Sequence, residues 1–267
     1  MDASSLESRQ HGYSVPPEVY DIACGWDPRF EIARLLEVAR WAGVRPESAL
    51  ELGCGTGRLL SALREEVPAV CGLELSPAMV AHARRSAATE VLPGDMTDFD
   101  LGRRFDLVFT SANTIRHVLS DEAVARMWQR IRAHLSAGGV FVADLELGFA
   151  AEAAKVGKSV TWAVSRGGTE VRTMWRVTEP PSVDTRCCGV VYAFEARGAE
   201  LNGSWQERFS LRTYEATEFL ELARRHAGLE PRGIYEIREP YLLETLAEKA
   251  SGRYLVALRN PGAAPGE

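Results

Sequence analysis

The sequence predicts an α/β protein in which strands and helices alternate, with an antiparallel β-sheet inserted near the middle. Two observations predict this fold class. Between about residues 48 and 147, short apolar segments alternate with helical patterns, which is typical of βαβ units and a parallel sheet. Between about residues 155 and 212, apolar and polar residues alternate one by one, as they do in a sheet with one buried face.

The composition is that of a folded protein without a nucleic-acid or membrane role. The 267 residues include 31 Lys and Arg against 37 Asp and Glu, for a net charge of −6, and 46% are hydrophobic. The acidic balance disfavours a dedicated nucleic-acid binder. No apolar run reaches the roughly 20 residues of a membrane-spanning helix, and the first ten residues lack the apolar core of a signal peptide. Five cysteines without a Cys-x-x-Cys pair favour a reducing, cytoplasmic location.

The elements follow in order along the chain. Residues 1–19 predict a polar arm or lid, and Asp27-Pro28 predicts the start of the first helix. Ser76-Pro77 starts a second helix, and a third, from about 121 to 135, is stopped by Gly138-Gly139. Strands are predicted at 49–52, 69–75, 90–92, 105–110, 140–147, 233–237 and 254–258.

The inserted segment spans residues 151–212 and divides an α/β domain made of residues 20–150 and 213–260. Within it, Val171, Thr173, Trp175 and Val177 alternate with charged residues or Met. We expect it to cap the substrate site, because apolar pockets with a few polar groups commonly bind small molecules. Its large residues, which are Trp162, Trp175, Tyr192 and Trp205, could equally serve sheet packing or a homodimer surface.

A glycine-rich loop follows the first strand, in the segment Ala-Leu-Glu-Leu-Gly-Cys-Gly-Thr-Gly-Arg that ends at Arg58. Gly53, Gly55 and Gly57 allow a tight turn and the close approach of a ligand. The spacing G-x-G-x-G differs from the dinucleotide fingerprint G-x-G-x-x-G, and no P-loop lysine is present. Glu51 would repel a pyrophosphate and suits a ligand that carries a cationic amino group.

Two more acids stand at the ends of the next two predicted strands. Glu74 lies 21 residues after Gly53, where a carboxylate commonly receives ribose hydroxyls. Asp95, in Gly-Asp-Met, could accept a hydrogen bond from an exocyclic amine such as that of adenine. Parallel strands end at one edge of a sheet, so Glu51, Glu74 and Asp95 should line one rim.

The combination E-L-G-C-G-T-G, an acid after the second strand, G-D-M and F-D-L-V resembles the class I S-adenosylmethionine-dependent methyltransferases. The resemblance covers about residues 20–147 and 214–260. It implies a Rossmann-like, mostly parallel sheet of seven strands with the last strand antiparallel, and a small antiparallel β insertion after strand five. It also implies S-adenosyl-L-methionine as the cofactor.

The resemblance assigns roles to particular residues. Glu51 and the backbone of Gly53, Cys54, Gly55 and Gly57 would hold the methionine part, and Ser111 would lie beside it. Glu74 would bind both ribose hydroxyls, and Leu75, Asp95 and Met96 would meet the adenine. No His-x-x-x-His or Cys-x-x-Cys spacing occurs, so we expect no metal.

The segment Ser-Ala-Asn-Thr-Ile-Arg-His that ends at His117 is similar to that of small-molecule methyltransferases, including sugar N-methyltransferases. His117 is the predicted catalytic base or orienting residue, titrating near its ordinary pKa of about 6.5. Tyr20, placed just before the first helix, is predicted to close over the cofactor or substrate.

The sequence therefore predicts methyl transfer to nitrogen or oxygen of a small-molecule acceptor, by in-line displacement. Two alternatives stay open: a non-catalytic cofactor-binding protein, and an NAD-dependent oxidoreductase, which Glu51 and the glycine spacing disfavour. The acidic balance disfavours a methyltransferase that acts on RNA or protein.

Overall fold

The computed structural model describes residues 14–87, 89–238 and 241–262. The strands of its larger sheet are β1 (Ser48–Leu52), β2 (Ala69–Glu74), β3 (Glu90–Pro93), β4 (Phe105–Thr110), β5 (Leu135–Leu147), β10 (Glu230–Arg238), β11 (Tyr241–Glu244) and β12 (Gly252–Arg259). Within these residues they pair in the order β11-β10-β12-β5-β4-β1-β2-β3. β1 to β5 are parallel, and β12 runs antiparallel to both neighbours. The predicted sheet with a reversed last strand is confirmed, and β11 extends its edge.

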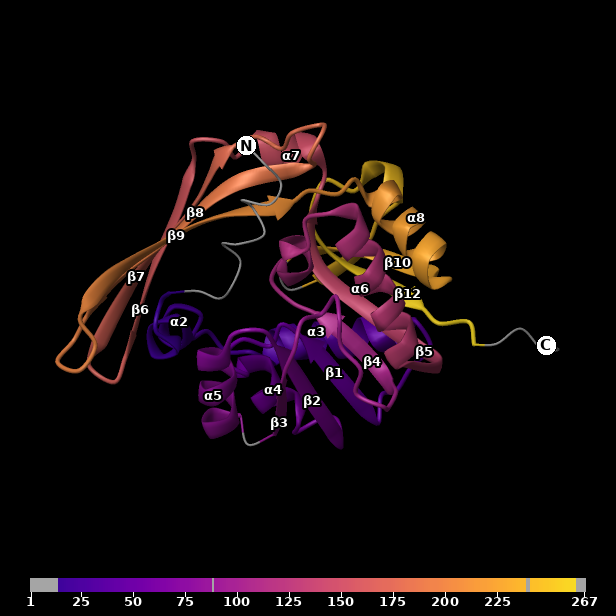
Figure 1. Cartoon of the computed structure of the whole chain (residues 1–267), viewed down its shortest axis with the longest axis horizontal. Helices are drawn as coiled ribbons and strands as arrows, with labels where there is room; N and C mark the ends of the chain where they lie inside the picture. The colour runs from indigo at the N-terminus through magenta and orange to yellow at the C-terminus, as the bar shows by residue number, and fades with distance from the viewer. Residues whose placement is uncertain (1–13, 88, 239–240, 263–267) are drawn as a thin grey trace.

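Helices cover both faces of this sheet (Figure 1). The helices α3 (Arg29–Trp41), α4 (Arg58–Leu63) and α5 (Pro77–Ser86) lie on one side, and α6 (Asp121–His134) and α8 (Ala216–Ala227) lie on the other. One face of α6 is apolar and buried, and its Trp128 packs edge-on against Phe219 of α8 at 5.2 Å between ring centroids. Burying such rings contributes about 1.5–3 kcal/mol each.

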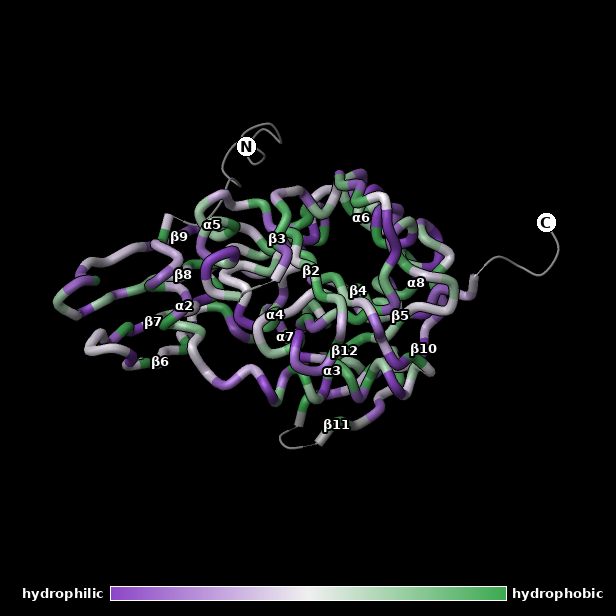
Figure 2. Tube along the Cα trace, turned by 90° about the horizontal axis from the view of Figure 1, so that it is seen from below, coloured by the Kyte–Doolittle hydropathy of each residue, from purple (hydrophilic) through white to green (hydrophobic). Residues whose placement is uncertain are grey.

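The insertion forms a separate sheet of four antiparallel strands. These are β6 (Ser159–Arg166), β7 (Thr169–Glu179), β8 (Cys187–Arg197) and β9 (Gly203–Arg212), paired in that order. Figures 1 and 2 show this sheet extending away from the larger one in two perpendicular views. Because side chains alternate between faces, Val171, Thr173, Trp175 and Val177 share one face. We call this the inner face, since it packs against the N-terminal helix.

That helix, α2 (Pro17–Ala23), lies between the insertion and α5 (Figure 1). The prediction that Tyr20 precedes the first helix is wrong, because Tyr20 lies within α2. Pro17 at the first helical position and Glu18 in the first turn favour a helix start. The part of the predicted arm at residues 1–13 lies outside the described residues.

The prediction that Gly138-Gly139 stops α6 is also wrong. The helix ends at His134, and β5 begins at the next residue, Leu135. The side chain of Asn260 donates hydrogen bonds to the carbonyl oxygens of Leu135 and Ser136, at 3.1 and 2.8 Å. These bonds hold the segment extended although it contains two glycines. The remaining short helices are η1 (Thr114–His117), α7 (Phe149–Ala153) and η2 (Ala247–Lys249).

Among the described residues, no helix is both long enough and apolar enough to cross a lipid bilayer.

Candidate active site

The glycine-rich turn follows β1 and is fastened to the end of β2. The amides of Gly53 and Cys54 both donate to the carbonyl oxygen of Leu73, at 2.7 and 3.1 Å. The Cys54 side chain points into the protein, where its sulfur would lie 2.6 Å from a Cβ on Gly72. Only the backbone of Cys54 is therefore available to a ligand, as the resemblance implies.

The three glycines have positive φ angles of 71° at Gly53, 55° at Gly55 and 78° at Gly57. A Cβ would collide with Thr114 at Gly53, and with Ala87 at Gly57, at 2.3 and 2.8 Å. A Cβ on Gly55 would meet nothing within 4 Å. The outer two glycines thus permit close packing of the chain on itself, whereas Gly55 faces open space.

Glu51 is a buried carboxyl group beside this turn, with 2% of its surface exposed. The hydroxyl of Ser111, at the end of β4, donates to its Oε1 at 3.0 Å. Its Oε2 is buried and finds no hydrogen-bond partner among the described residues. Burial raises the pKa of Glu51 to about 8, because the low-dielectric interior disfavours the charged form. An unpaired buried oxygen of this kind suits a ligand that brings a hydrogen-bond donor.

Glu74 links the ends of β1 and β2. Its two carboxylate oxygens accept hydrogen bonds from the amides of Gly55 and Ser76, both at 2.8 Å. Each oxygen keeps a further lone pair. The carboxylate is therefore fixed in position and still able to accept hydroxyl donors.

The residues that are predicted to meet the adenine lie just after β2 and β3. Leu75, directly after Glu74, has 44% of its surface exposed, so it is not part of the core. Asp95 is exposed, and its Oδ1 accepts from the amide of Thr97 at 2.7 Å. Met96 is half-buried, and its terminal methyl would lie 3.5 Å from a Cβ on Gly53. The strand order brings the predicted residues to neighbouring strand ends, as expected.

The backbone after β4 is strained, a feature that the sequence analysis missed. Ala112 and Asn113 have φ angles of 48° and 69°, which cost about 1–3 kcal/mol each. The amides of both residues donate to Asp144, one to its carboxylate at 3.2 Å and one to its carbonyl at 3.0 Å. Arg253 holds the Asp144 carboxylate through two bonds of 2.8 and 2.7 Å. This packing fixes the loop that carries His117.

His117 ends η1 and lies against the insertion. Its ring centroid is 5.1 Å from that of Phe209 on β9. Burial, followed by the neighbouring positive charge of Arg116, lowers the pKa of His117 to about 4. The expectation of titration near 6.5 is therefore wrong, because packing against the insertion removes water from the ring. At neutral pH the imidazole is uncharged.

Aromatic side chains line the inner face of the insertion and connect His117 to Tyr20. We call them the aromatic wall, which consists of Trp162, Trp175, Tyr192, Phe194, Trp205 and Phe209. Trp175 lies 5.8 Å from Phe209 and 5.2 Å from Tyr192, measured between ring centroids. Tyr20 lies 6.4 Å from Tyr192. Both predicted catalytic residues therefore contact one surface.

A buried ion pair anchors this arrangement, and no sequence pattern indicated it. Arg116 and Glu152 of α7 are 3.1 Å apart, with side chains 1% and 4% exposed. Arg116 also donates to the carbonyl oxygen of Arg212, at the end of β9, at 2.7 Å. The loop after β4 is thereby joined to both ends of the insertion.

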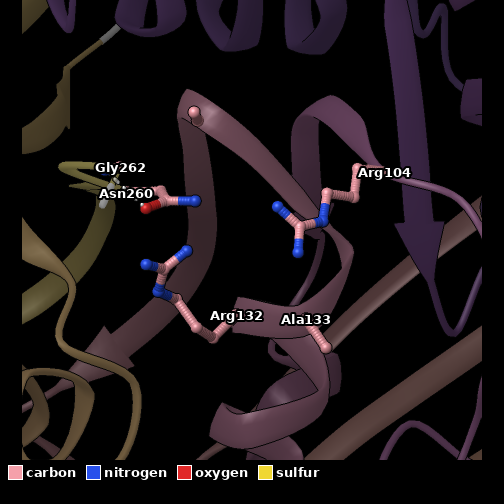
Figure 3. Close-up of a pocket in the computed structure, with 6 residues that line it drawn as sticks. Arg104, Arg132, Ala133, Asn260 and Gly262 are labelled. Carbon is pink, nitrogen blue, oxygen red and sulfur yellow. Dashed lines mark hydrogen bonds between the residues drawn. The ribbon is translucent and has the colours of Figure 1, made fainter. Parts of the chain in front are cut away.

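A cavity of about 380 Å³ lies at the end of the larger sheet that is opposite to the glycine-rich turn. Arg104, Arg132 and Asn260 contribute polar atoms to it (Figure 3). Arg104 precedes β4 and Asn260 follows the antiparallel β12, so this cavity is separate from the glycine-rich turn. Among the described residues, no cluster of His, Cys, Asp and Glu side chains is arranged to hold a metal ion.

The residues at the carboxyl ends of β1, β2 and β4 fit S-adenosylmethionine. The unpaired Oε2 of Glu51 can accept from an ammonium group, and the open space beside Gly55 leaves room for a ligand against its backbone. The fixed carboxylate of Glu74 can accept hydroxyl donors. An ammonium group and two ribose hydroxyls are what the cofactor offers at its amino-acid and ribose ends.

Comparison with protein-family models matches residues 49–139 to the family described as Methyltransferase domain. The chain is 37% identical over 131 residues to dTDP-3-amino-3,6-dideoxy-alpha-D-glucopyranose N,N-dimethyltransferase of Streptomyces fradiae, covering 48% of this chain and 51% of that one. It is 33% identical over 147 residues to dTDP-4-amino-2,3,4,6-tetradeoxy-D-glucose N,N-dimethyltransferase of Saccharopolyspora spinosa, covering 54% of this chain and 57% of that one. The chain spans about half the length of the curated relatives it matches.

Two methyltransferases are among the solved structures that resemble most of this chain. A sugar N-methyltransferase from Streptoalloteichus sp has a TM-score of 0.74 and 27% identity, over 93% of both chains. An amino pentose methyltransferase from Micromonospora echinaspora, solved with S-adenosylmethionine bound, has a TM-score of 0.70 and 24% identity over 94% of this chain and 99% of that one, which is a likeness of fold. The resemblance to S-adenosylmethionine-dependent methyltransferases that the motifs carry is thereby confirmed.

Proposed function

We propose that this protein transfers the methyl group of S-adenosyl-L-methionine to an amino group of a small-molecule acceptor, with an amino sugar as the acceptor class. The observation that carries the proposal is the buried carboxyl of Glu51, with one unpaired oxygen beside the open backbone of Gly55. An NAD-dependent oxidoreductase would place a pyrophosphate here, which Glu51 would repel when ionised. The cofactor assignment is further supported by the methyltransferase-domain match over residues 49–139.

The acceptor assignment rests on the aromatic wall and on the relatives. Trp175 and Phe209 of the wall are only partly buried, and Phe209 lies next to His117, a combination suited to the C–H face of a sugar ring that carries an amine. The curated relatives in Streptomyces fradiae and Saccharopolyspora spinosa are N,N-dimethyltransferases of dTDP-linked amino sugars. Nitrogen is therefore preferred over oxygen as the methylated atom.

The cofactor, when bound, supplies a methyl group activated by its sulfonium sulfur. Glu51 and the glycine-rich turn would fix the amino-acid end of the site, and the aromatic wall would hold the acceptor on the opposite side. With the cofactor held there, the lone pair of a neutral amine would form the N–C bond as the S–C bond breaks, and the methylated ammonium would release one proton to solvent. Positioning alone can supply roughly 7–11 kcal/mol of rate enhancement in ideal cases.

His117 is proposed to orient the acceptor rather than to remove its proton. The lowered pKa of about 4 leaves the imidazole neutral at pH 7, and a neutral imidazole has one nitrogen of acceptor character. A base this weak removes a proton from an ammonium group inefficiently. Orientation of the nitrogen lone pair toward the methyl group is the role that its environment favours.

The proposal is tested in two steps. Calorimetric titration with S-adenosylhomocysteine and with NADH should show binding of the first and not of the second. Incubation with radiolabelled S-adenosylmethionine and a panel of free and nucleotide-linked amino sugars should then label an acceptor. Binding without transfer to any amine or to a cell extract would favour a non-catalytic binding protein. Preferential binding of NADH would refute the proposal.

A further inference from the structure

The cavity opposite the glycine-rich turn has two arginine side chains in its walls. Arg104 directly precedes β4, and Arg132 lies in the last turn of α6. Figure 3 shows both guanidinium groups pointing into the space between these two elements. The remaining lining residues are neutral, and they are Ala133, Ala137, Asn260 and Gly262. The lining residues therefore present two positive charges and no negative one.

Neither guanidinium has a partner in the part of the chain that the structure describes. Two arginines close to them in the sequence do have one, since Arg103 pairs with Glu90, and Arg130 pairs with Asp98 at 2.9 Å. The whole chain has 37 acids against 31 Lys and Arg, so a site with two unpaired cations does not follow from the composition. Like charges that face one cavity repel each other, and a bound anion would relieve this repulsion.

The wall behind the two arginines is held in place by Asn260, which is fully buried. Besides the two bonds that its side-chain nitrogen donates to β5, its Oδ1 accepts from the amide of Gly262 at 2.9 Å. Its backbone amide donates to the carbonyl oxygen of Gly139 at 2.8 Å, and its carbonyl oxygen accepts from the amide of Gly138 at 2.9 Å. The first residues of β5 and the residues after β12 are thereby tied together. A site that is already ordered loses less entropy when a ligand binds.

We infer that this cavity binds the phosphate group of a small phosphorylated molecule, with Arg104 and Arg132 contacting the phosphate from two sides. A carboxylate presents two oxygens in one direction and suits a single guanidinium, whereas a phosphate has oxygens on several sides and can receive two. The partial negative charge at the C-terminal end of α6 opposes an anion here, so the site needs both arginines.

The size of the cavity indicates more than a free phosphate ion. Its volume of about 380 Å³ lies in the range of about 300–1,000 Å³ that is usual for small-molecule sites. Ala133 and Ala137 line it with methyl groups only, which leaves space for the organic part of the ligand. The site is separate from the proposed methyl-transfer site, so it does not depend on that assignment.

The test is calorimetric titration at low ionic strength with inorganic phosphate, inorganic diphosphate, glycerol 3-phosphate and succinate. The three phosphate compounds should bind the wild-type protein with one site per chain, glycerol 3-phosphate at least as tightly as inorganic phosphate, and succinate more weakly. Arg104→Gln and Arg132→Gln should each weaken phosphate binding about tenfold or more, which is the range for a lost charge-assisted hydrogen bond. Added salt should weaken binding to the wild type, because partly exposed charges are screened.

Controls separate this site from neighbouring charge, from folding and from the methyl-transfer site. Arg103→Gln removes an adjacent positive charge that is already paired with Glu90, and should leave phosphate affinity unchanged, as should saturation with S-adenosylhomocysteine. Arg132→Lys keeps the charge without the planar fork and should retain part of the affinity; it carries the test if the glutamine variant does not fold.

Two results would overturn the inference as a whole. They are the absence of saturable phosphate binding to the wild type, and equal binding by the wild type and the Arg104 and Arg132 variants. Succinate binding as tight as that of inorganic phosphate would overturn the assignment to phosphate. Glycerol 3-phosphate binding that is weaker than that of inorganic phosphate would overturn the assignment to a phosphorylated organic molecule.

Discussion

Replacing Glu51 by glutamine should stabilise the ligand-free protein and weaken its cofactor binding at the same time. Glutamine has the shape of glutamate, and its amide oxygen can keep the 3.0 Å hydrogen bond from Ser111. The replacement removes the ability of the buried group to ionise and puts an N–H donor where the ionised carboxyl has its second acceptor oxygen. The opposite signs of the two effects distinguish a binding residue from a structural one.

The magnitude follows from the raised pKa of Glu51, about 8 against an ordinary value of 4.5. A carboxyl whose pKa is raised by folding destabilises the folded state. The cost is absent below the unfolded pKa, grows as the pH rises toward the folded pKa, and is constant above it. At about 1.4 kcal/mol per pH unit, the cost is about 2 kcal/mol at pH 6 and about 4–5 kcal/mol at pH 8.5.

Urea unfolding of both proteins at pH 6 and pH 8.5 measures this difference. The advantage of Glu51→Gln over the wild type should increase by about 2–3 kcal/mol between the two pH values. Glu200→Gln, at an exposed position, is the control and should show no such increase. The affinity for S-adenosylhomocysteine should fall at least tenfold in Glu51→Gln. A stability difference that is the same at both pH values would refute the reasoning, because Glu51 would then not titrate in the interior.

Three further substitutions test other parts of the site. Gly55→Val should cost about 1–2 kcal/mol of strain at a positive φ and place its side chain in the open space beside the turn; calorimetry should show at least a tenfold loss of S-adenosylhomocysteine affinity, and unchanged affinity would contradict this placement. His117→Ala should lower kcat about tenfold to hundredfold, because the acceptor loses its orientation, and should leave the affinity for S-adenosylhomocysteine unchanged. The kcat of the wild-type protein should show no inflection from His117 between pH 6 and 8, because the pKa of His117 is about 4. Glu152→Ala should destabilise the protein by about 3–5 kcal/mol in urea unfolding, because Arg116 would remain buried without its carboxylate; a loss below about 1 kcal/mol would show that another group pairs with it.

The cofactor side of the site could be predicted because its signals are local. A strand that runs into closely spaced glycines leaves few alternatives for the backbone, and the positive φ angles of Gly53, Gly55 and Gly57 agree with that expectation. The positions of Glu51 and Glu74 follow from strand order alone, since parallel strands end at one edge. What the sequence could not give is the state of Glu51, because the missing partner of its Oε2 depends on everything that surrounds it.

The acceptor side could be predicted only in outline. The alternation of apolar and polar residues identified which side chains share the inner face of the insertion. It could not identify the contact between His117 and Phe209, because that contact joins segments far apart in the chain. The lowered pKa of His117 arises first from burial, which depends on segments far apart in the chain, so no local pattern could reveal it. The helix α2 was missed because its seven residues are too few for a clear apolar period, and it is packing on the insertion that stabilises it.

The contacts of α2 are more extensive on one of its two sides. Toward the insertion, Val19 and Ala23 are fully buried, Arg166 of β6 donates to Asp21, and the Trp162 indole donates to the carbonyl oxygen of Ala23 at 2.8 Å. Toward α5 and the glycine-rich turn, α2 makes polar contacts, which are Glu18 to His82 at 3.4 Å and Asp21 to Thr56 at 3.1 Å. Partly exposed pairs of this type contribute about 0–1 kcal/mol. The insertion itself is fixed to the loop after β4 by a buried ion pair whose disruption costs several times more. The weakest boundary around the site therefore lies between α2 and the glycine-rich turn, on the cofactor side, whereas the aromatic wall and His117 are held together as one unit.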